Sequence, residues 1–143
     1  MIAVDTNILV YAHREGLPLH AAARERLVAL AEGDAAWAIP VFCLGEFIRV
    51  STHPKLFDPP FSAAEACDAM GRLLASPSLR ILTPGPRYWG LLAAAIREAD
   101  ARGNLVFDAQ IVAVCRESGA SALLTEDRDF DRFAPFPTMR VSS

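Results

Sequence analysis

Residues 2–12 read IAVDTNILVYA, and this stretch decides the fold. The opening run Ile2–Val4 is short and entirely apolar, which is typical of a strand buried on both faces of a sheet. Asp5 interrupts the run, and the apolar residues that resume at Ile8 indicate a helix. We therefore expect Asp5 at the carboxyl end of a buried first strand, with a helix directly after it.

The rest of the chain alternates short apolar runs with longer amphipathic segments. We expect strands at residues 2–4, 37–39, 79–82, 122–124 and 139–141. We expect helices at residues 8–12, 19–31, 40–50, 62–74, 86–102 and 105–117. Ser62 followed by Glu65 is a capping box, and the prolines within residues 53–61 make that stretch a loop. Alternating strands and helices predict an α/β fold, with a central, mostly parallel sheet of four to five strands flanked by helices on both faces.

The length and composition fit one domain over residues 1–143. Apolar residues make up 52% of the chain, more than one core needs, which indicates a partner. The longest stretch without a charged side chain is Ala35–Gly45, far short of the roughly 20 residues of a membrane span. Because the first residues lack the basic segment of a secretion signal, we expect a cytoplasmic protein without membrane association. We expect Cys43, Cys67 and Cys115 to be buried, reduced thiols.

Two acidic residues are expected at one edge of the sheet. Asp5 ends the first strand, and Asp127 follows the fourth strand after Thr125 and Glu126. The carboxyl ends of parallel strands lie at the same edge, where α/β proteins gather their functional residues. Two carboxylates at that edge repel each other unless a positive charge joins them.

Glu46 and Asp108 add two carboxylates that we expect to point inward. Apolar residues stand three or four positions away from each of them along its helix. Four inward acids without matching inward bases carry a large desolvation cost for every ion. A divalent cation offsets that cost and the mutual repulsion, and carboxylates are ligands that Mg²⁺ and Mn²⁺ prefer. The pattern therefore predicts a metal site.

Each acid also has a purely structural interpretation. Asp5 is placed to cap the helix after it, and Glu46 is placed to pair with Arg49. Asp108 would interact with the dipole of its helix from the first turn, and Asp127 would cap the turn that follows it. All four structural roles would have to hold together to remove the metal site.

Four motifs, in this order and spacing, resemble the PIN domain. They are Asp5-Thr6-Asn7 after the first strand, Glu46 in the helix after the second strand, Asp108-Ala109 early in a late helix, and Thr125–Phe130 after the fourth strand. The resemblance extends from Ile2 to about Phe133. The small size and the absence of extra domains are similar to the VapC toxins of bacterial toxin–antitoxin pairs, and residues 47–54 resemble one subset of them.

The resemblance implies a hydrolase, a Mg²⁺- or Mn²⁺-dependent endoribonuclease in which metal-activated water cleaves RNA. It implies an acidic quartet that binds the metal and carries catalysis, namely Asp5, Glu46, Asp108 and Asp127, with Asp129 as an accessory acid. Of the quartet, Asp5 and Asp108 are expected to bind the metal directly. We expect Thr6 and Asn7 to fix the loop after the first strand, and Thr125 to hydrogen-bond an acid.

The net charge of −3 is compatible with an RNA substrate once the metal site is set aside. Without those five acids, 12 acidic side chains remain against 14 basic ones, so the remainder carries +2. Candidates for phosphate contact are Arg14, Arg49, Arg87, Arg128 and Arg132. The resemblance also implies a VapB-type antitoxin and a transfer or ribosomal RNA substrate. With the apolar excess, it predicts a homodimer through the helix at residues 19–31 or the helix at residues 62–74.

Two other functions remain open at the level of the sequence. A haloacid-dehalogenase-like phosphatase also carries an aspartate at the end of its first strand. That site needs a second aspartate two residues later, where Asn7 stands, and a later lysine, whereas Lys55 is the only lysine. A catalytically silent PIN domain used for binding is the other alternative, and the presence of all four acids argues against it.

Overall fold

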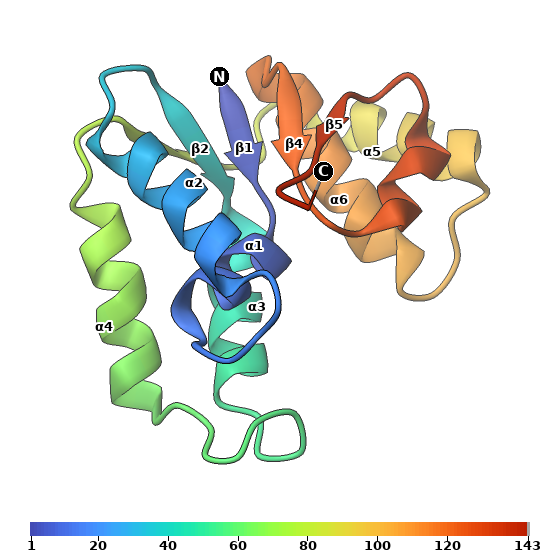
Figure 1. Cartoon of the computed structure of the whole chain (residues 1–143). Helices are drawn as coiled ribbons and strands as arrows, with labels where there is room; N and C mark the ends of the chain where they lie inside the picture. The colour runs from blue at the N-terminus through green and yellow to red at the C-terminus, as the bar shows by residue number, and fades with distance from the viewer. Residues whose placement is uncertain (143) are drawn as a thin grey trace.

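A five-stranded parallel sheet forms the centre of the protein in the computed structural model, which describes residues 1–142. The strands are β1 (Ile2–Val4), β2 (Trp37–Pro40), β3 (Leu79–Leu82), β4 (Ala122–Leu124) and β5 (Thr138–Met139). Their order in the sheet is β3-β2-β1-β4-β5, and every neighbouring pair is parallel (Figure 1). The predicted α/β class and mostly parallel sheet are confirmed.

In the described part of the chain, six α-helices and a short 3-10 helix connect the strands. They are α1 (Thr6–His13), α2 (His20–Glu32), α3 (Val41–Ser51), α4 (Ala63–Leu74), α5 (Tyr88–Ala99), α6 (Leu105–Ser118) and η1 (Arg128–Phe133). Right-handed crossovers place α1 to α4 on one face of the sheet, because β1, β2 and β3 follow one another outward. The chain then returns past β1 to β4, which places α5 and α6 on the other face. Within residues 1–142, no helix is long and apolar enough to cross a membrane.

The reversal of strand order creates the position where a site is expected. β1 pairs with β2 on one side and with β4 on the other; from β2 the chain continues to β3 at one edge of the sheet, and from β4 it continues to β5 at the opposite edge. The carboxyl ends of β1 and β4 therefore border a crevice, which is the usual ligand position in open α/β sheets. Asp5 and Thr125 follow these two strands directly.

The core holds the sheet edge rigid beneath this crevice. Trp37, Phe47, Phe130 and Phe133 are fully or almost fully buried. Phe130 and Phe133 belong to η1, and their ring centroids lie 6.5 Å apart. Burying two aromatic rings fixes η1, which carries the acids that follow β4, against α5 and α6.

The structure corrects several boundaries predicted from the sequence. Pro40 belongs to β2, where it pairs with Leu82, and α3 begins one residue later. The fifth strand is Thr138–Met139 instead of residues 139–141. Helix α5 ends before Asp100 because that residue adopts a left-handed conformation with φ of 48°. Cys43 and Cys115 are buried free thiols, whereas Cys67 is exposed because α4 buries only one stripe of its surface.

Candidate active site

Asp5 lies at the crevice with its carboxylate buried and hydrogen-bonded. Its side chain is 5% exposed, caps α1 by accepting from the backbone N–H of Thr6 at 2.7 Å, and accepts from Thr125 Oγ1 at 2.7 Å. Burial raises the pKa of Asp5 from 3.8 to about 6, although both hydrogen bonds oppose the rise. The helix-capping interpretation of Asp5 is therefore correct, and it coexists with the position at the crevice.

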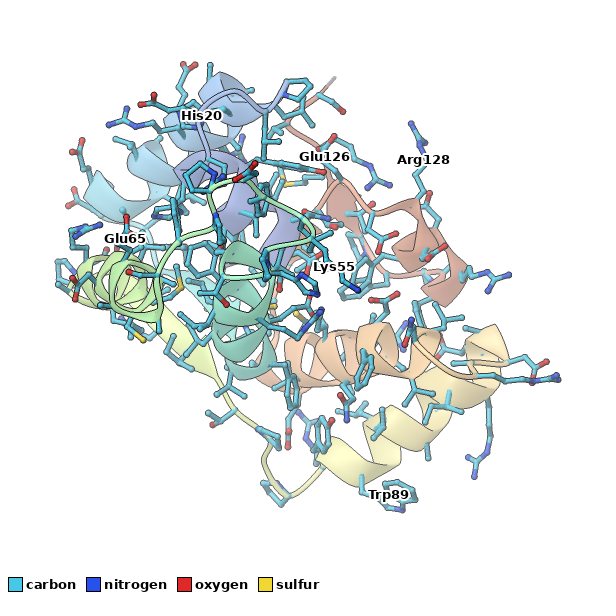
Figure 2. The ribbon with its side chains drawn as sticks, turned by 90° about the horizontal axis from the view of Figure 1, so that it is seen from below. His20, Lys55, Glu65, Trp89, Glu126 and Arg128 are labelled. Carbon is cyan, nitrogen blue, oxygen red and sulfur yellow. The ribbon has the colours of Figure 1, made fainter. Side chains whose placement is uncertain are left out.

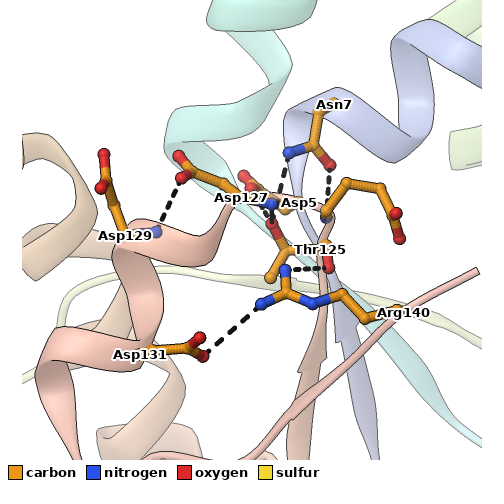
Figure 3. A network of polar contacts seen from close by, with 8 residues as sticks. Asp5, Asn7, Thr125, Asp127, Asp129, Asp131 and Arg140 are labelled. Carbon is orange, nitrogen blue, oxygen red and sulfur yellow. Dashed lines mark hydrogen bonds and ion pairs between the residues drawn. The ribbon is translucent and has the colours of Figure 1, made fainter. Parts of the chain in front are cut away.

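Thr125 and Asn7 connect the ends of β1 and β4 (Figure 3). Asn7 Nδ2 donates to Thr125 Oγ1 at 3.3 Å, and the backbone N–H of Glu126 donates to Asn7 Oδ1 at 3.3 Å. The backbone N–H of Asp127 also donates to Thr125 Oγ1, at 3.0 Å. Because the Thr125 hydroxyl donates its hydrogen bond to Asp5, the network fixes the orientation of the buried carboxylate. Thr6 is buried beside it, and its Oγ1 has no hydrogen-bond partner among the described residues.

Asp127 and Asp129 enter the crevice from the start of η1. Asp127 Oδ1 accepts from the backbone N–H of Asp129 at 2.9 Å, so Asp127 caps η1 as its structural interpretation predicted. Asp131 lies on the same short helix, but Arg140 donates to it at 3.5 Å (Figure 3). Among the ion pairs of residues 1–142, Asp131 alone of these three acids has a cationic partner, which separates it from the crevice pair.

Asp108 approaches the same place from the first turn of α6. One carboxylate oxygen from each of Asp108, Asp127 and Asp129 lies within 4.8 Å of the others, a spacing at which the three could hold one metal ion. Burial, together with the neighbouring carboxylates, raises the pKa of Asp108 from 3.8 to about 7. These residues fit a hard divalent cation, because the donors are oxygens and their mutual repulsion is uncompensated.

Glu46 faces this group across an open cleft of about 680 Å³. It is half-buried on α3 and lines the cleft together with the three grouped aspartates. The expected pairing with Arg49 is not among the ion pairs of residues 1–142. Asp5 and Glu46 lie outside the tight group, and each of them raises the pKa of Asp108 through its charge.

The cleft contains residues that sequence reasoning did not assign to a site. These are Phe42, Gly45, Asn104, Leu105, Phe107, Gln110 and Ile111. Most of them flank the acids on α3 and α6, so helical spacing from Glu46 and Asp108 is the signal that could have found them. Phe107 stands out because it is a large apolar side chain that is 59% exposed.

The candidate phosphate contacts occupy different environments. Arg49 lines the cleft. Arg14 instead lies 4.3 Å and 4.8 Å from the ring centroids of Phe57 and Phe61, and Arg87 donates to the Glu117 carbonyl oxygen. Arg128 extends into solvent from η1 (Figure 2). Arg132 is exposed on the same helix, and only Arg49 of the five lines the cleft.

Comparisons with known proteins agree with this architecture. The PIN domain family model matches residues 2–135. Ribonuclease VapC43 of Mycobacterium tuberculosis is 41% identical over 133 residues, which are 93% of this chain and 90% of the relative. Ribonuclease VapC25 of the same species is 34% identical over 134 residues, 94% of each chain.

Solved structures share the fold over nearly the whole chain. The VapBC2 complex of Rickettsia felis, bound to a promoter DNA fragment, matches with a TM-score of 0.67 at 21% identity and covers 98% of both chains. VapC20 of M. tuberculosis, described as a toxin that cleaves the sarcin-ricin loop, also gives 0.67 at 21% identity, over 95% of this chain and 96% of that one. With its sheet order, its acidic crevice and its curated relatives, the chain belongs to the PIN-domain family and, within it, to the VapC toxins.

Proposed function

We propose that this protein is a Mg²⁺- or Mn²⁺-dependent endoribonuclease that acts as the toxin of a type II toxin–antitoxin module and cleaves transfer or ribosomal RNA. The convergence of Asp108, Asp127 and Asp129 in one open cleft carries the proposal. Within residues 1–142, none of these carboxylates forms an ion pair. Unpaired acids that crowd together are costly for a fold, so a cationic ligand explains their arrangement better than stability does.

Asp108, Asp127 and Asp129 would hold the cation, with Glu46 reaching it through water. A bound Mg²⁺ or Mn²⁺ supplies a water of lowered pKa and neutralises the charge that develops on the phosphoryl group. The tight group differs from the set expected from the sequence, in which Asp5 was a direct ligand. Asp5 lies outside the tight group, and its buried carboxylate is held by Thr6 and Thr125, so we assign it to the buried base of the site.

The chain's own side chains orient the site in this proposal. Thr125 holds Asp5, and Asn7 holds both Thr125 and the backbone at Glu126. The main-chain N–H of Asp129 holds Asp127 in the cleft. These bonds keep the carboxylates aligned when RNA arrives, so that the cleft needs little rearrangement for an in-line attack.

An RNA cleavage assay with matched acidic variants tests the proposal. The purified chain should cut a mixture of transfer and ribosomal RNA in millimolar Mg²⁺ or Mn²⁺, and EDTA should stop the reaction. Asp108→Asn should remove cleavage, whereas Asp131→Asn should keep it, because Asp131 pairs with Arg140 outside the cleft. Metal-independent cleavage, or equal activity of Asp108→Asn and wild type, would contradict the proposal. Mapping the 5′ ends of the products identifies the RNA.

An antitoxin partner follows from the family and from the acidic cleft. An arginine inserted among the carboxylates would form charge-assisted hydrogen bonds and exclude the cation. Co-expression with the product of the neighbouring small reading frame should give a stable complex that no longer cleaves RNA. If that product neither co-purifies with this chain nor inhibits it, the antitoxin proposal is wrong.

We also propose a homodimer in the cytoplasm, with one PIN domain in each chain. The apolar side chains of Val28 on α2 and Leu74 on α4 are exposed on the two helices expected to form the interface. Trp89 on α5, 72% exposed and directed away from the body of the molecule, offers a different interface (Figure 2). Light scattering at about 20–50 μM, a range in which weak dimers form, should give twice the mass of 15.5 kDa. A monomer mass would refute the dimer.

A further inference from the structure

Phe107 is an exposed aromatic side chain at the catalytic cleft. It is 59% exposed on the first turn of α6, directly before Asp108, and both residues line the cleft. The other ring at the cleft, Phe42, lies against Tyr88 with 6.2 Å between the centroids. Phe107 takes part in none of the aromatic or cation–π pairs of residues 1–142. Its face is therefore available to a ligand in the cleft.

Arg49 provides a positive charge at the same cleft. It lies one turn beyond Glu46 on α3, is exposed, and forms no ion pair among the described residues. Because the Arg49 guanidinium does not pair with a neighbouring carboxylate within residues 1–142, its N–H donors are free to bind an anion. The carboxylates of the cleft repel a bare phosphate. The positive charge of Arg49 therefore favours the binding of a phosphate that enters together with a cation.

We propose that Phe107 and Arg49 position the RNA substrate, with Phe107 stacking on an unpaired base beside the scissile phosphate and Arg49 binding an adjacent phosphate. The inference rests on the proposed ribonuclease function and specifies its substrate as RNA with unpaired bases. Proteins read RNA mainly at loops and single strands, where splayed bases stack on aromatic rings. Because Phe107 and Asp108 line the same cleft, a base on the ring belongs to a nucleotide close to the one being cut.

An RNA occupant explains the composition of the cleft better than an apolar protein segment does. The cleft combines one open ring, one free guanidinium and a carboxylate group suited to a metal, which match a base, a phosphate and a cleavage site. A volume of about 680 Å³ lies within the range of pockets that hold small organic ligands, so it accommodates a nucleotide. A protein partner that covers Phe107 is the competing occupant, and the measurements below distinguish the two.

The stacking role is tested with Phe107→Ala, Phe107→Leu and Phe107→Trp. Alanine and leucine should raise KM for a single-stranded RNA about 5- to 100-fold, the usual effect of losing one base–aromatic stack. Their kcat should change much less, and tryptophan should restore the wild-type KM because it keeps a π face. Because the ring is mostly exposed, all three variants should melt at the wild-type temperature. Leu56→Ala is the control, because Leu56 is an exposed large apolar side chain outside the cleft lining.

A spectroscopic readout separates stacking from simple bulk. The probe is the RNA segment cut by the wild type, with 2-aminopurine beside the scissile phosphate, bound to the Glu46→Gln protein, which is expected to be inactive because it lacks one acid of the quartet. Binding should quench its fluorescence, and Phe107→Leu in the same background should remove the quenching. A fully paired duplex of the same sequence should bind weakly and show no Phe107 dependence.

The phosphate role of Arg49 has its own measurement. Arg49→Gln should weaken RNA binding and reduce the slope of log K against log salt by about 0.7, the value for one phosphate contact on a single strand. Arg24→Gln, on the exposed face of α2, should leave the slope unchanged.

The outcomes distinguish this inference from the proposed function. If the wild type cleaves RNA while Phe107→Ala and Phe107→Leu keep its KM, the stacking inference is wrong and the ribonuclease function stands. If these variants lose affinity for the antitoxin but not for RNA, the ring is a protein contact and the inference is also overturned. If the wild type cleaves no RNA under any condition, the proposed function itself fails.

Discussion

Replacing Asp108 by asparagine is expected to stabilise the metal-free protein at pH 8. The pKa of this carboxyl rises from 3.8 to about 7 on folding. Below pH 3.8 the residue is protonated in both the folded and unfolded states, so it does not affect stability. As the pH rises, the unfolded chain releases the proton before the folded chain does, and the free energy of unfolding falls until the pH passes about 7. Above that pH the ionised side chain carries its full cost.

The expected size follows from the same values. A rise from 3.8 to about 7 corresponds to about 4 kcal/mol, since one pKa unit equals about 1.4 kcal/mol. Asp108 is only half-buried, so solvent screening reduces this to about 2 kcal/mol. A neutral asparagine of the same shape removes that cost. For a chain of this length, the melting temperature should rise by about 4–8 °C.

Thermal melting in EDTA at pH 8 and pH 4, followed by circular dichroism, measures this effect. At pH 4 the two proteins should differ by only about 0.5 kcal/mol, because folded Asp108 is still protonated and the unfolded chain has only begun to release its proton. Mg²⁺ at 100 times its Kd should add about 2.7 kcal/mol to the wild type and nothing comparable to Asp108→Asn. Asp131→Asn is the control and should give no stabilisation, since Asp131 is exposed and its charge is already paired with Arg140. An Asp108→Asn protein that melts at or below the wild type at pH 8 would refute the argument.

Two further substitutions probe the bonds that shape the site and its neighbouring loop. Thr125→Val removes the hydroxyl that donates to buried Asp5 at 2.7 Å and should lower the free energy of unfolding, measured in urea, by about 2–3 kcal/mol. Thr125→Ser keeps a hydroxyl and should keep most of the wild-type stability. Equal urea midpoints for the two variants would contradict the role of the hydroxyl. Arg14→Ala removes contacts to the rings of Phe57 and Phe61 and a 2.9 Å bond to the Pro59 carbonyl oxygen, which should speed protease cleavage within residues 53–61 more than Arg14→Lys does. An unchanged cleavage pattern would show that Arg14 does not hold the loop.

The sequence was most informative where local pattern and topology agree. Apolar runs located the first four strands, and the capping box at Ser62 and Glu65 is present as predicted. The position of Asp5 and Asp127 at one sheet edge also followed from the pattern, because parallel strands order their ends without any side-chain detail. The 3-10 helix after β4 was expected only as a turn, since six residues carry too little periodicity to indicate a helix.

The sequence did not predict which side chains group together within the site. The tight group of carboxylates consists of Asp108, Asp127 and Asp129, whereas the sequence favoured Asp5 with Asp108 as direct ligands. Spacing along the chain does not show how closely the carboxylate oxygens of different residues approach one another, and that distance separates Asp5 from the group. The sequence also did not predict that Phe107 is exposed. Helical periodicity indicates which residues share a face of α6, but not what covers that face.

The hydrogen bonds that join distant segments of the fold also arrange the side chains of the site. Thr125 lies 120 positions from Asp5, and their hydrogen bond joins β1 to the segment after β4 at the point where the strand order reverses. Opening this edge of the sheet would expose Asp5 and separate the acids of η1 from that of α6. The electrostatic repulsion among these acids therefore weakens the junction between β1 and the segment after β4, which holds both halves of the chain together. A cation in the cleft would relieve that repulsion and tighten the junction, which couples readiness for catalysis to the stability of the whole fold.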